Sequence, residues 1–231
     1  MVAMVLCFFF SCSSRTNRQA SENIIDSAHT QMQAPVAPHK PGNELIIRHK
    51  VINFAKWRKE YESQDSIHRL HGLTKYLLGR GMSDSNIVIA ILKMDDVKNA
   101  KEFMDFYGTK AYMKKSRVMG RPRIIYLDRI MHDSTKVEQN ARLMVDYEVK
   151  NWDSWKKEFD KDRQSRLEAG LKDRGLGYSF GDNHLVTSIF AVTDVQKATA
   201  FLKSPVLKQK MARAGVEGPP GFFFYNIVQK Y

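Results

Sequence analysis

The residue types that most often bind metal ions cluster at one place in the sequence, Asp65-x-x-His68-x-x-His71. A spacing of three residues brings side chains to one side of a helix, where a carboxylate and two imidazoles could hold a divalent cation such as zinc. The related stretch 98 residues later has Arg163 and Arg166 at the first two positions. Polar residues near a helix end are usually solvated, so the sequence predicts no metal site and leaves these three residues as weak candidates.

Two further side chains could transfer protons, His49 and Tyr147. They occupy equivalent places in two similar stretches, Leu45–Val51 and Leu143–Val149, whose alternation of residue types predicts strands. Histidine changes its charge near neutral pH, which suits a general base, and tyrosine can act as an acid. Both residues lie on the mostly apolar face of their strand. A partly buried histidine with an ordinary structural role is the simpler interpretation, and the two are weak catalytic candidates.

The opposite face of the same two stretches carries charges of opposite sign, Arg48 and Lys50 in the first and Asp146 and Glu148 in the second. If the fold brings these faces together, the charges attract and favour the pairing of unlike partners. The four residues are the candidate ligand-binding residues, lining or rimming the space between two sheets. The alternative is a set of solvated edge charges that contribute little to stability.

Composition narrows the possible partners. The chain has 37 Lys and Arg against 25 Asp and Glu, a net charge of +12, and most of the excess lies between residues 44 and 130. A basic surface attracts anions, and we expect acidic lipid head groups or a small anion, with no nucleic acid, because the chain has features of an exported protein. Glycine-rich phosphate loops, nucleophile elbows and zinc motifs are missing from the sequence, and no cofactor is expected. A basic cluster comprises Lys110, Lys114, Lys115, Arg117, Arg121 and Arg123. This cluster either faces lipid head groups or forms the solvated face of a helix.

The N-terminus predicts export. Residues 1–10 are continuously apolar but too short to span a bilayer, which takes about 20 residues. A short apolar run that ends in a small residue is typical of a cleaved signal, and Phe9-Phe10-Ser11-Cys12 resembles a bacterial lipoprotein signal with Cys12 as the acylated residue. The alternative is a mildly hydrophobic N-terminus without a targeting role. The other cysteine is Cys7, so the folded part is expected to have no disulfide.

The sequence repeats itself. Aligned with a shift of 98 residues, Leu45–Ile130 matches Leu143–Val228 without a gap, with about 22 of about 86 positions identical. The matches include Trp57 with Trp155 and a Val-x-Gly-x-Pro segment that begins at Val118 and at Val216. We interpret this as a duplication. It divides the chain into a signal segment (1–11), a proline-containing tether (12–43), a first repeat (44–131), a linker (132–141) and a second repeat (142–231).

Each repeat predicts the element order β-α-β-β-α-β, which is a ferredoxin-like unit. Asn53 and Asn151 are placed to cap a first helix, and Asp96 and Asp194 a second one. Apolar residues at i, i+3 and i+7 after each asparagine give the first helix a buried face. Gly120-Arg121-Pro122 is expected to turn the chain into the last strand. The predicted strands are Leu45–Val51, Tyr76–Arg80, Ile87–Leu92 and Ile124–Ile130, with Leu143–Val149, Gly177–Phe180, Leu185–Val192 and Phe222–Val228 in the second repeat.

The predicted strands are apolar on both faces. The last strand of each repeat contains four apolar or aromatic residues in a row, and the third strand is similar. A sheet with one wet face would alternate apolar and polar residues, so both faces must be covered. Helices cover one face, and we expect the sheet of the other repeat to cover the second. The sequence therefore predicts an α+β fold of two tandem ferredoxin-like repeats packed sheet to sheet, an intrachain pseudo-dimeric α+β barrel.

These residues resemble a known superfamily. The pattern Val51-x-Asn53-x-x-x-Trp57-x-x-Glu60, followed by Gly72-Leu73, Asp96-Val97 and the Val-x-Gly-x-Pro segment, is similar to that of the dimeric α+β barrel proteins, in particular bacterial proteins described as cyclases or as antibiotic-biosynthesis-monooxygenase-like. The resemblance covers both repeats. It implies the barrel fold and says little about chemistry, because the superfamily includes cofactor-free monooxygenases, haem-degrading enzymes, isomerases and members without known activity.

The resemblance leaves several functions open. The haem-degrading members use a histidine on the second helix, and neither Asp96–Arg117 nor Asp194–Arg213 contains one, so that function is not expected. The leading hypothesis is an exported lipoprotein of the bacterial envelope, facing the periplasm or the exterior, that binds a small hydrophobic or anionic ligand between its sheets. The alternatives are a cofactor-independent monooxygenase or cyclase-type enzyme, and a non-catalytic interaction module with a filled core. A monomer whose repeats pair with each other, anchored to the membrane through Cys12, is expected.

Overall fold

The computed structural model describes residues 42–107 and 110–231. In the first half of this region the chain forms β1 (Glu44–Val51), α1 (Phe54–Glu62), α2 (Asp65–Leu70), β2 (Leu73–Gly81), β3 (Ile87–Met94), α3 (Val97–Tyr107), α4 (Lys110–Lys115) and β4 (Val118–His132). The second half contains β5 (Ala141–Val149), α5 (Trp152–Lys161), α6 (Arg163–Glu168), β6 (Leu171–Ser179), β7 (Asp182–Val192), α7 (Val195–Leu202), α8 (Pro205–Arg213) and β8 (Val216–Lys230). The predicted signal, Cys12 and the tether up to residue 41 lie outside the described residues. Within the described part, no helix is long and apolar enough to cross a membrane.

Local sequence explains where the helices begin. The side chain of Asn53 accepts a hydrogen bond from the backbone N–H of Lys56, and Asn151 accepts one from Ser154, so both predicted caps are confirmed. Asp194 caps α7 in the same way. Such caps satisfy backbone donors that the first helical turn leaves free, which is worth about 1 kcal/mol each.

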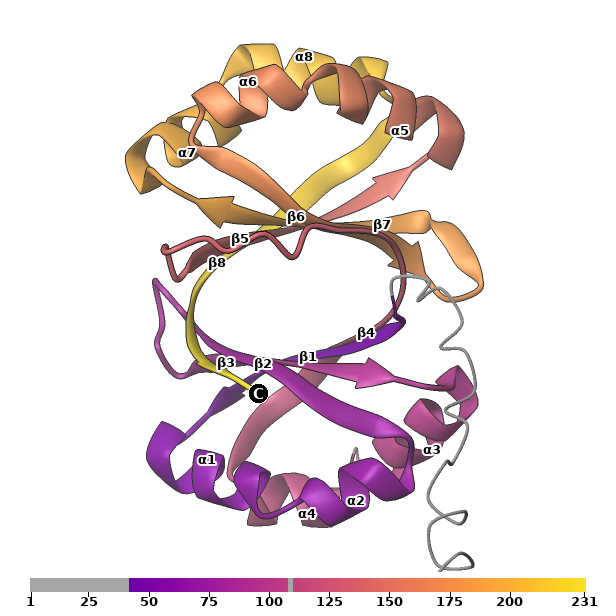
Figure 1. The fold of residues 1–231 in the computed structure, drawn as a ribbon, viewed down its shortest axis with the longest axis vertical. Coiled ribbons are helices and arrows are strands. Elements are labelled where there is room, and N and C mark those ends of the chain that lie inside the picture. The colour runs from indigo at the N-terminus through magenta and orange to yellow at the C-terminus, as the bar shows by residue number, and fades with distance from the viewer. Residues whose placement is uncertain (1–41, 108–109) are drawn as a thin grey trace, which may run out of the picture. The chain divides into compact units, whose positions relative to one another are not determined.

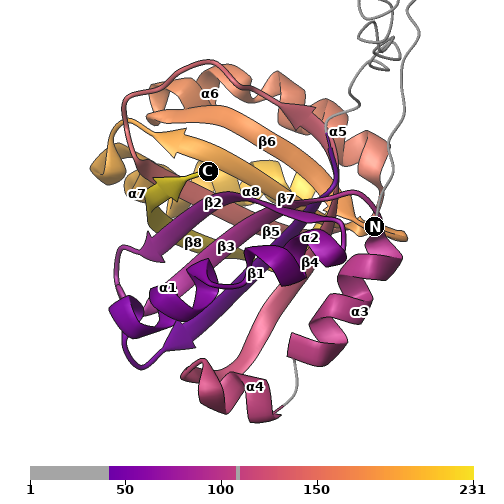
Figure 2. The ribbon, with the colours of Figure 1, turned by 60° about the horizontal axis from the view of Figure 1, so that its bottom comes forward.

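The eight strands form one closed antiparallel barrel in the order β1-β3-β2-β8-β5-β7-β6-β4. Figure 1 shows the strands of the two halves facing each other, with α1–α4 outside one side and α5–α8 outside the other. Figure 2, turned by 60°, shows the same layers from a second direction. Both faces of the sheet are therefore covered, as the apolar strands predicted. The mixed α+β class and the barrel match the sequence-based expectation.

Two strands are much longer than predicted and join the halves. β4 and β8 each span 15 residues. β4 pairs with β1 through Val118–Leu127 and then with β6 of the second half through Leu127–His132. β8 pairs with β5 first and with β2 of the first half at its C-terminal end, and its path from one half into the other is visible in Figure 1. Backbone hydrogen bonds of these two strands close the barrel.

The turn predicted at Gly120-Arg121-Pro122 is wrong, because these residues lie within β4. Gly120 has a φ of +68°, a conformation that suits glycine, and the pairing of β4 with β1 shifts its register beside it, between Arg48 and Lys50. A bulge therefore takes the place of the expected turn. The second correction concerns β2 and β6, which begin at Leu73 and Leu171, before the predicted starts. The short helices α2 and α6 were not predicted as separate elements.

Buried side chains form three clusters. Two lie between the barrel wall and the helices, one in each half, and contain Trp57 and Trp155. The third fills the middle of the barrel, between the two halves. Its residues come from both halves: Ile46, Leu77, Ile89, Ile91, Ile125, Leu127, Met144, Ile189, Phe223, Tyr225 and Ile227. The predicted aromatic faces of α1 and α5 are thus core residues.

A glycine lets the halves approach closely where β2 meets β8. A Cβ atom on Gly79 would lie 2.5 Å from Cδ2 of Tyr225 and 2.9 Å from Cγ2 of Ile89. Neither neighbour can move without displacing the packed middle of the barrel. We therefore expect Gly79→Ala to lower the free energy of unfolding by about 1–3 kcal/mol, the usual cost of overpacking a core. Urea unfolding measures this, and Gly42→Ala is the control because nothing lies within 4 Å of a Cβ there. Equal stability of the two variants would contradict the close approach.

Candidate functional site

A small aromatic cavity lies between the barrel wall and the helices of the first half. It is partly open to the surface, has a volume of about 50 Å³, and we refer to it as the first-half cavity. Strands supply Ile47, His49, Ala90, Val118 and Pro122, and helices supply Trp57, Tyr61, His68, Phe103, Met104, Tyr107 and Met113. This is the side of β1 on which the sequence placed His49.

Rings in contact connect His49 to His68 across this cavity. The His49 ring is 5.3 Å from the Trp57 ring, which stacks on Tyr61 at 5.0 Å. Tyr61 in turn lies 5.5 Å from His68. The helical spacing of Trp57 and Tyr61 on α1 points both rings at the sheet, while His68 comes from α2. Two histidines and a tyrosine thus border one apolar space.

Three polar atoms of these residues are buried and have no hydrogen-bond partner in the described part of the structure. They are Nε2 of His49, the hydroxyl of Tyr61 and Nδ1 of His68. Tyr61 is 6% exposed and His68 is 2% exposed. Buried polar groups are nearly always paired, so an unpaired one needs an explanation, and three around one cavity need a common explanation.

Burial keeps both histidines neutral. It lowers the pKa of His49 from 6.5 to about 4. The pKa of His68 is also lowered to about 4, first by burial and then by the positive charge of Lys75. Burial raises the pKa of Tyr61, with Tyr231, Glu62 and Asp65 adding to the effect. At neutral pH the cavity therefore offers two neutral imidazoles and an un-ionised phenol.

The predicted metal candidates do not come together. Asp65 forms an ion pair with Lys75 at 2.6 Å, and His71 packs its ring against Phe103. Within the described residues no group of three or more His, Cys, Asp or Glu residues could hold a metal ion. His68 faces the aromatic cavity instead of its two sequence neighbours.

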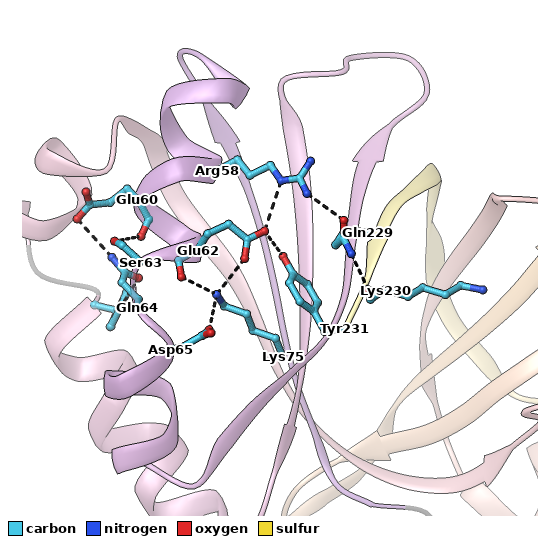
Figure 3. Close-up of polar contacts among 11 residues, drawn as sticks. Arg58, Glu60, Glu62, Ser63, Gln64, Asp65, Lys75, Gln229, Lys230 and Tyr231 are labelled. Atoms are coloured by element: carbon cyan, nitrogen blue, oxygen red, sulfur yellow. Dashed lines mark hydrogen bonds and ion pairs between the residues drawn. The ribbon is translucent and has the colours of Figure 1, made fainter.

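Lys75 belongs to a network that ties the C-terminus to α1 (Figure 3). Its ammonium, 5% exposed, pairs with Glu62 at 3.2 Å as well as with Asp65. The hydroxyl of Tyr231, after the last residue of β8, donates to Glu62 at 2.6 Å. The same ammonium lies 4.6 Å from the centre of the Tyr61 ring. The network therefore borders Tyr61, one of the residues that line the first-half cavity, and it gives Asp65 a partner in Lys75.

The equivalent place in the second half is satisfied internally. A second cavity of about 50 Å³ contains Tyr147, Trp155, Phe159 and Arg166 among its lining residues. Tyr147 accepts a hydrogen bond from Ser188 at 3.4 Å, and burial raises its pKa to about 12. Arg166, aligned with His68, forms a two-pronged ion pair with Asp173. The two predicted proton-transfer residues therefore border different cavities, and only His49 borders one with unpaired groups.

The structure separates the four predicted ligand-binding residues. The Arg48 guanidinium lies over the Phe223 ring at 4.7 Å, and burial lowers its pKa while nearby Asp146 opposes that shift. Asp146, 9% exposed, pairs with Arg123 at 3.0 Å and accepts from Thr187. An ion pair between the two halves thus forms between Arg123 and Asp146, and Arg48 lies near it. Lys50 instead pairs with Asp84 at 2.8 Å, and Glu148 is exposed.

Sequence reasoning singled out His49 and His68 but did not connect them. Tyr61 was assigned to the core alone. A signal was present in the comparison of the two repeats: His49, Tyr61 and His68 align with Tyr147, Phe159 and Arg166, so three polar changes fall on one side of the fold. Their convergence depends on the break between α1 and α2, which the sequence did not reveal.

No family model and no curated protein matches the sequence. Solved structures match in fold. An anthrone oxidase-like protein aligns with 84% of this chain and 93% of its own, with a TM-score of 0.58 and 12% identity. A monooxygenase-like protein of Fusobacterium nucleatum aligns with 81% of this chain and 93% of its own, with a TM-score of 0.51 and 8% identity. A heme-binding protein of Thermus thermophilus aligns with 81% and 92%, with a TM-score of 0.51 and 10% identity.

These similarities establish the fold, an α+β barrel that the chain shares with these solved structures. A heme-binding protein shares this fold, so haem is the cofactor to compare with the residues of this chain. The helices α3, α4, α7 and α8 contain no histidine, and the two helix-side cavities, at about 50 Å³ each, are far too small for a haem. His49 and His68 lie on β1 and α2, surrounded by packed rings. The residues present do not fit a haem in either cavity.

Proposed function

We propose that the protein is a cofactor-independent oxygenase of the monooxygenase type, acting in the first-half cavity on an aromatic substrate that has an acidic C–H or O–H bond. The observation that supports this most strongly is the set of three unpaired polar atoms, on His49, Tyr61 and His68, around a space that apolar and aromatic side chains line. The superfamily fold is compatible with such chemistry, and the similarity to an anthrone oxidase-like protein suggests the substrate class.

The energetic argument compares the two halves. Leaving a buried polar group unpaired costs about 1–3 kcal/mol, so three such groups lower the stability of the free protein. The second half avoids this cost, because Arg166 pairs with Asp173 and Ser188 pairs with Tyr147. A substrate that brings its own hydroxyl and carbonyl would supply the missing partners in the first half. The first half thus retains unpaired buried polar groups at its cavity, and the second half does not. Such a local cost in stability is typical of a functional site.

The proposed reaction begins with proton transfer to His49. Its neutral Nε2 accepts a proton from the substrate, which leaves a delocalised carbanion or phenolate. This anion donates two electrons to dioxygen in two single steps, a C–O bond forms, and a peroxide results. The peroxide loses water as a carbonyl forms, so that one CH₂ group and one O₂ give one C=O group and one H₂O. Both electron pairs come from the substrate, and the tyrosine hydroxyl can donate to the developing oxygen anion.

A base whose pKa is about 4 is weak in the empty cavity. The reaction itself offsets this weakness, because proton transfer places an imidazolium next to a substrate anion. An opposite charge at contact distance in an apolar setting raises the pKa of the imidazole again. Before a substrate binds, burial thus keeps His49 unprotonated and available over a wide pH range.

Size limits how the substrate can bind. A cavity of about 50 Å³ holds a few water molecules or a dioxygen molecule but no complete aromatic molecule. Because the cavity is partly open to the surface, we propose that the reacting edge of the substrate enters while the rest of the molecule lies at the opening. Dioxygen then occupies the inner, dry part next to His49.

Oxygen consumption tests this function directly. Purified protein, treated with chelator and shown spectroscopically to contain no haem or flavin, is mixed with anthrone or with hydroxylated naphthalenes in an oxygen electrode. We expect oxygen uptake equal to the substrate consumed and, with ¹⁸O₂, one labelled oxygen atom in the product. Stoichiometric binding without uptake would support the binding-only alternative. Absence of both binding and uptake would support the structural module.

The pH dependence has a defined direction. Since the pKa of His49 in the protein without substrate is about 4, we expect the rate to stay level from pH 8 down to about 5 and to fall as the pH approaches 4. Stability follows the same direction: the pKa values of His49 and His68 lie below the ordinary 6.5, so the unfolded chain takes up protons first and stability falls as the pH drops from 6.5 to 4. A rate that halves near pH 6.5 would contradict a buried neutral base.

The organisation of the chain is a second part of the proposal. We propose that the halves are tandem copies of one ferredoxin-like unit and pair as two subunits of a dimeric barrel would. In support, α1, α2, β2, α3 and β4 all begin 98 residues before α5, α6, β6, α7 and β8. The expected envelope location, the anchor at Cys12 and the monomeric state remain predictions from the sequence.

A further inference from the structure

A larger pocket opens at one end of the barrel, between the two halves and away from the first-half cavity. Its volume is about 320 Å³, within the range of sites for small organic molecules, and we refer to it as the barrel-end pocket. Its inner side consists of Leu77, Ile91, Ile189 and Ile227, which belong to the cluster that fills the middle of the barrel. Its polar side chains include Tyr76, Arg129, His132, Arg142, Arg174 and Tyr225.

Arg142 is a buried cation that no described carboxylate pairs with. It is 4% exposed and is the second residue of β5. It lies on the same face of the strand as Met144, which belongs to the cluster in the middle of the barrel. One of its nitrogens, Nη1, donates to the carbonyl oxygens of Gln139 and Ala141, at 2.6 and 2.9 Å. Burial lowers its pKa. Arginines at this depth ordinarily have a carboxylate partner, since an isolated buried charge is costly.

Two more buried groups next to it have unused hydrogen-bonding capacity. Tyr225 is 0% exposed and its hydroxyl has no partner in the described structure. Arg129, 4% exposed, reaches the same space from β4 and leaves Nε without a partner, although its Nη atoms contact Glu44 and His132. Two guanidinium groups and a phenol therefore line the same pocket with hydrogen-bond donors.

The charge of the pocket is positive. Arg174 pairs with Asp133 at 3.0 Å, and the linker residue Lys136 and the last residue of β8, Lys230, add two positive charges at the rim. Arg129 is matched by Glu44, whose pKa is raised to about 7 by burial, against the pull of Arg129. Among the described residues that line the pocket, Asp133 is the one carboxylate, so positive charge exceeds negative charge there.

We propose that the barrel-end pocket binds a small organic anion with a carboxylate head and an apolar body. The planar guanidinium of Arg142 matches a carboxylate in a two-pronged geometry, and the hydroxyl of Tyr225 can donate to the same group. The four aliphatic side chains of the inner wall receive the hydrocarbon part. This site is distinct from the proposed oxygenase cavity and does not depend on it.

A purely structural role of Arg142 is the main alternative. Its two backbone contacts hold the linker end at Gln139 against β5, and such contacts could by themselves justify the residue. They do not explain the Tyr225 hydroxyl, which makes no hydrogen bond within the described residues. Tyr225 therefore separates the two explanations: in a structural role phenylalanine would serve at least as well.

Isothermal titration calorimetry with octanoate tests the proposal, with octanol and inorganic phosphate as comparison probes. We expect one octanoate per chain, and at least tenfold weaker binding of octanol and of phosphate. Arg142→Gln should weaken octanoate binding about ten- to hundredfold, as expected for the loss of a charged hydrogen bond. Arg213→Gln, which removes the same charge from the exposed end of α8, should leave it unchanged. Equal binding of octanol and octanoate, or equal effects of the two substitutions, would overturn the proposal.

Tyr225→Phe keeps the test decisive if Arg142→Gln does not fold. We expect this variant to bind octanoate about tenfold more weakly, while its unfolding midpoint without ligand is unchanged or higher because an unpaired hydroxyl has been removed. Undiminished octanoate binding by Tyr225→Phe would contradict the assigned role. His49→Phe should bind octanoate normally, so that a failure of this site and a failure of the oxygenase proposal give different results.

Discussion

Replacement of His49 by phenylalanine is expected to lower kcat/KM of the oxygen-consuming reaction by about 10²–10⁴-fold, the range for loss of a general base. Phenylalanine keeps an aromatic ring against Trp57, whose ring lies 5.3 Å from that of His49. It removes the unpaired Nε2 atom, so the free energy of unfolding should stay the same or rise. Loss of activity with retained stability is the signature of a residue kept for chemistry.

The second half supplies the matched control for this experiment. Tyr147 occupies the aligned position, and its hydroxyl accepts a hydrogen bond from Ser188. Tyr147→Phe should leave the rate unchanged and should cost some stability. If Tyr147→Phe lowered the rate as much as His49→Phe does, the first-half cavity would not be the reaction site. A His49 variant that is both fully active and less stable would give His49 a structural role only.

The largest effect on stability is expected at Arg166. Its guanidinium donates to both carboxylate oxygens of Asp173, at 2.9 and 2.8 Å, and to the carbonyl oxygen of Phe159 at 2.5 Å. It also lies over the Phe159 ring at 3.7 Å. Arg166→Met removes the partner of a carboxylate that is only 16% exposed. We expect the free energy of unfolding to fall by about 3–5 kcal/mol, the usual cost of breaking a buried ion pair from one side.

Urea unfolding of three variants would distinguish the contribution of the ion pair to the free energy of unfolding from the contribution of packing. Arg163→Met, on the same helix but exposed, should change stability by less than about 0.5 kcal/mol. Arg166→Met combined with Asp173→Leu should recover most of the loss, because no buried charge is then left without a partner. A double variant as unstable as the single one would mean that packing against Phe159, and not the ion pair, accounts for the effect.

The sequence predicted the fold where local patterns determine structure. The asparagine caps, the apolar face around Trp57 and the strands with two apolar faces were all sufficient to place elements and to require a covered sheet. The extent of β4 was not predictable in this way. Gly120 and Pro122 are typical of turns, and they lie in a strand because pairing with β1 on both sides of them, at Met119 and Arg123, outweighs local preference.

The site was predictable only in part. Residue type and strand face identified His49, and a helix-end cluster identified His68 for a metal role that the geometry does not support. Their meeting around Tyr61 depends on how α1 and α2 pack on β1, which no single-sequence pattern encodes. The pocket beside Arg142 depends on contacts between residues far apart in the chain. Buried donors without partners can be recognised only once the surroundings are known.

The two long strands β4 and β8 determine how the halves are held together. Each begins in the sheet of its own half and ends hydrogen-bonded to a strand of the other, β4 to β6 and β8 to β2. The linker after His132 is therefore not the bond that keeps the protein whole. Proteolytic cleavage of the linker would therefore yield two fragments that remain associated through the strand pairs β4–β6 and β8–β2.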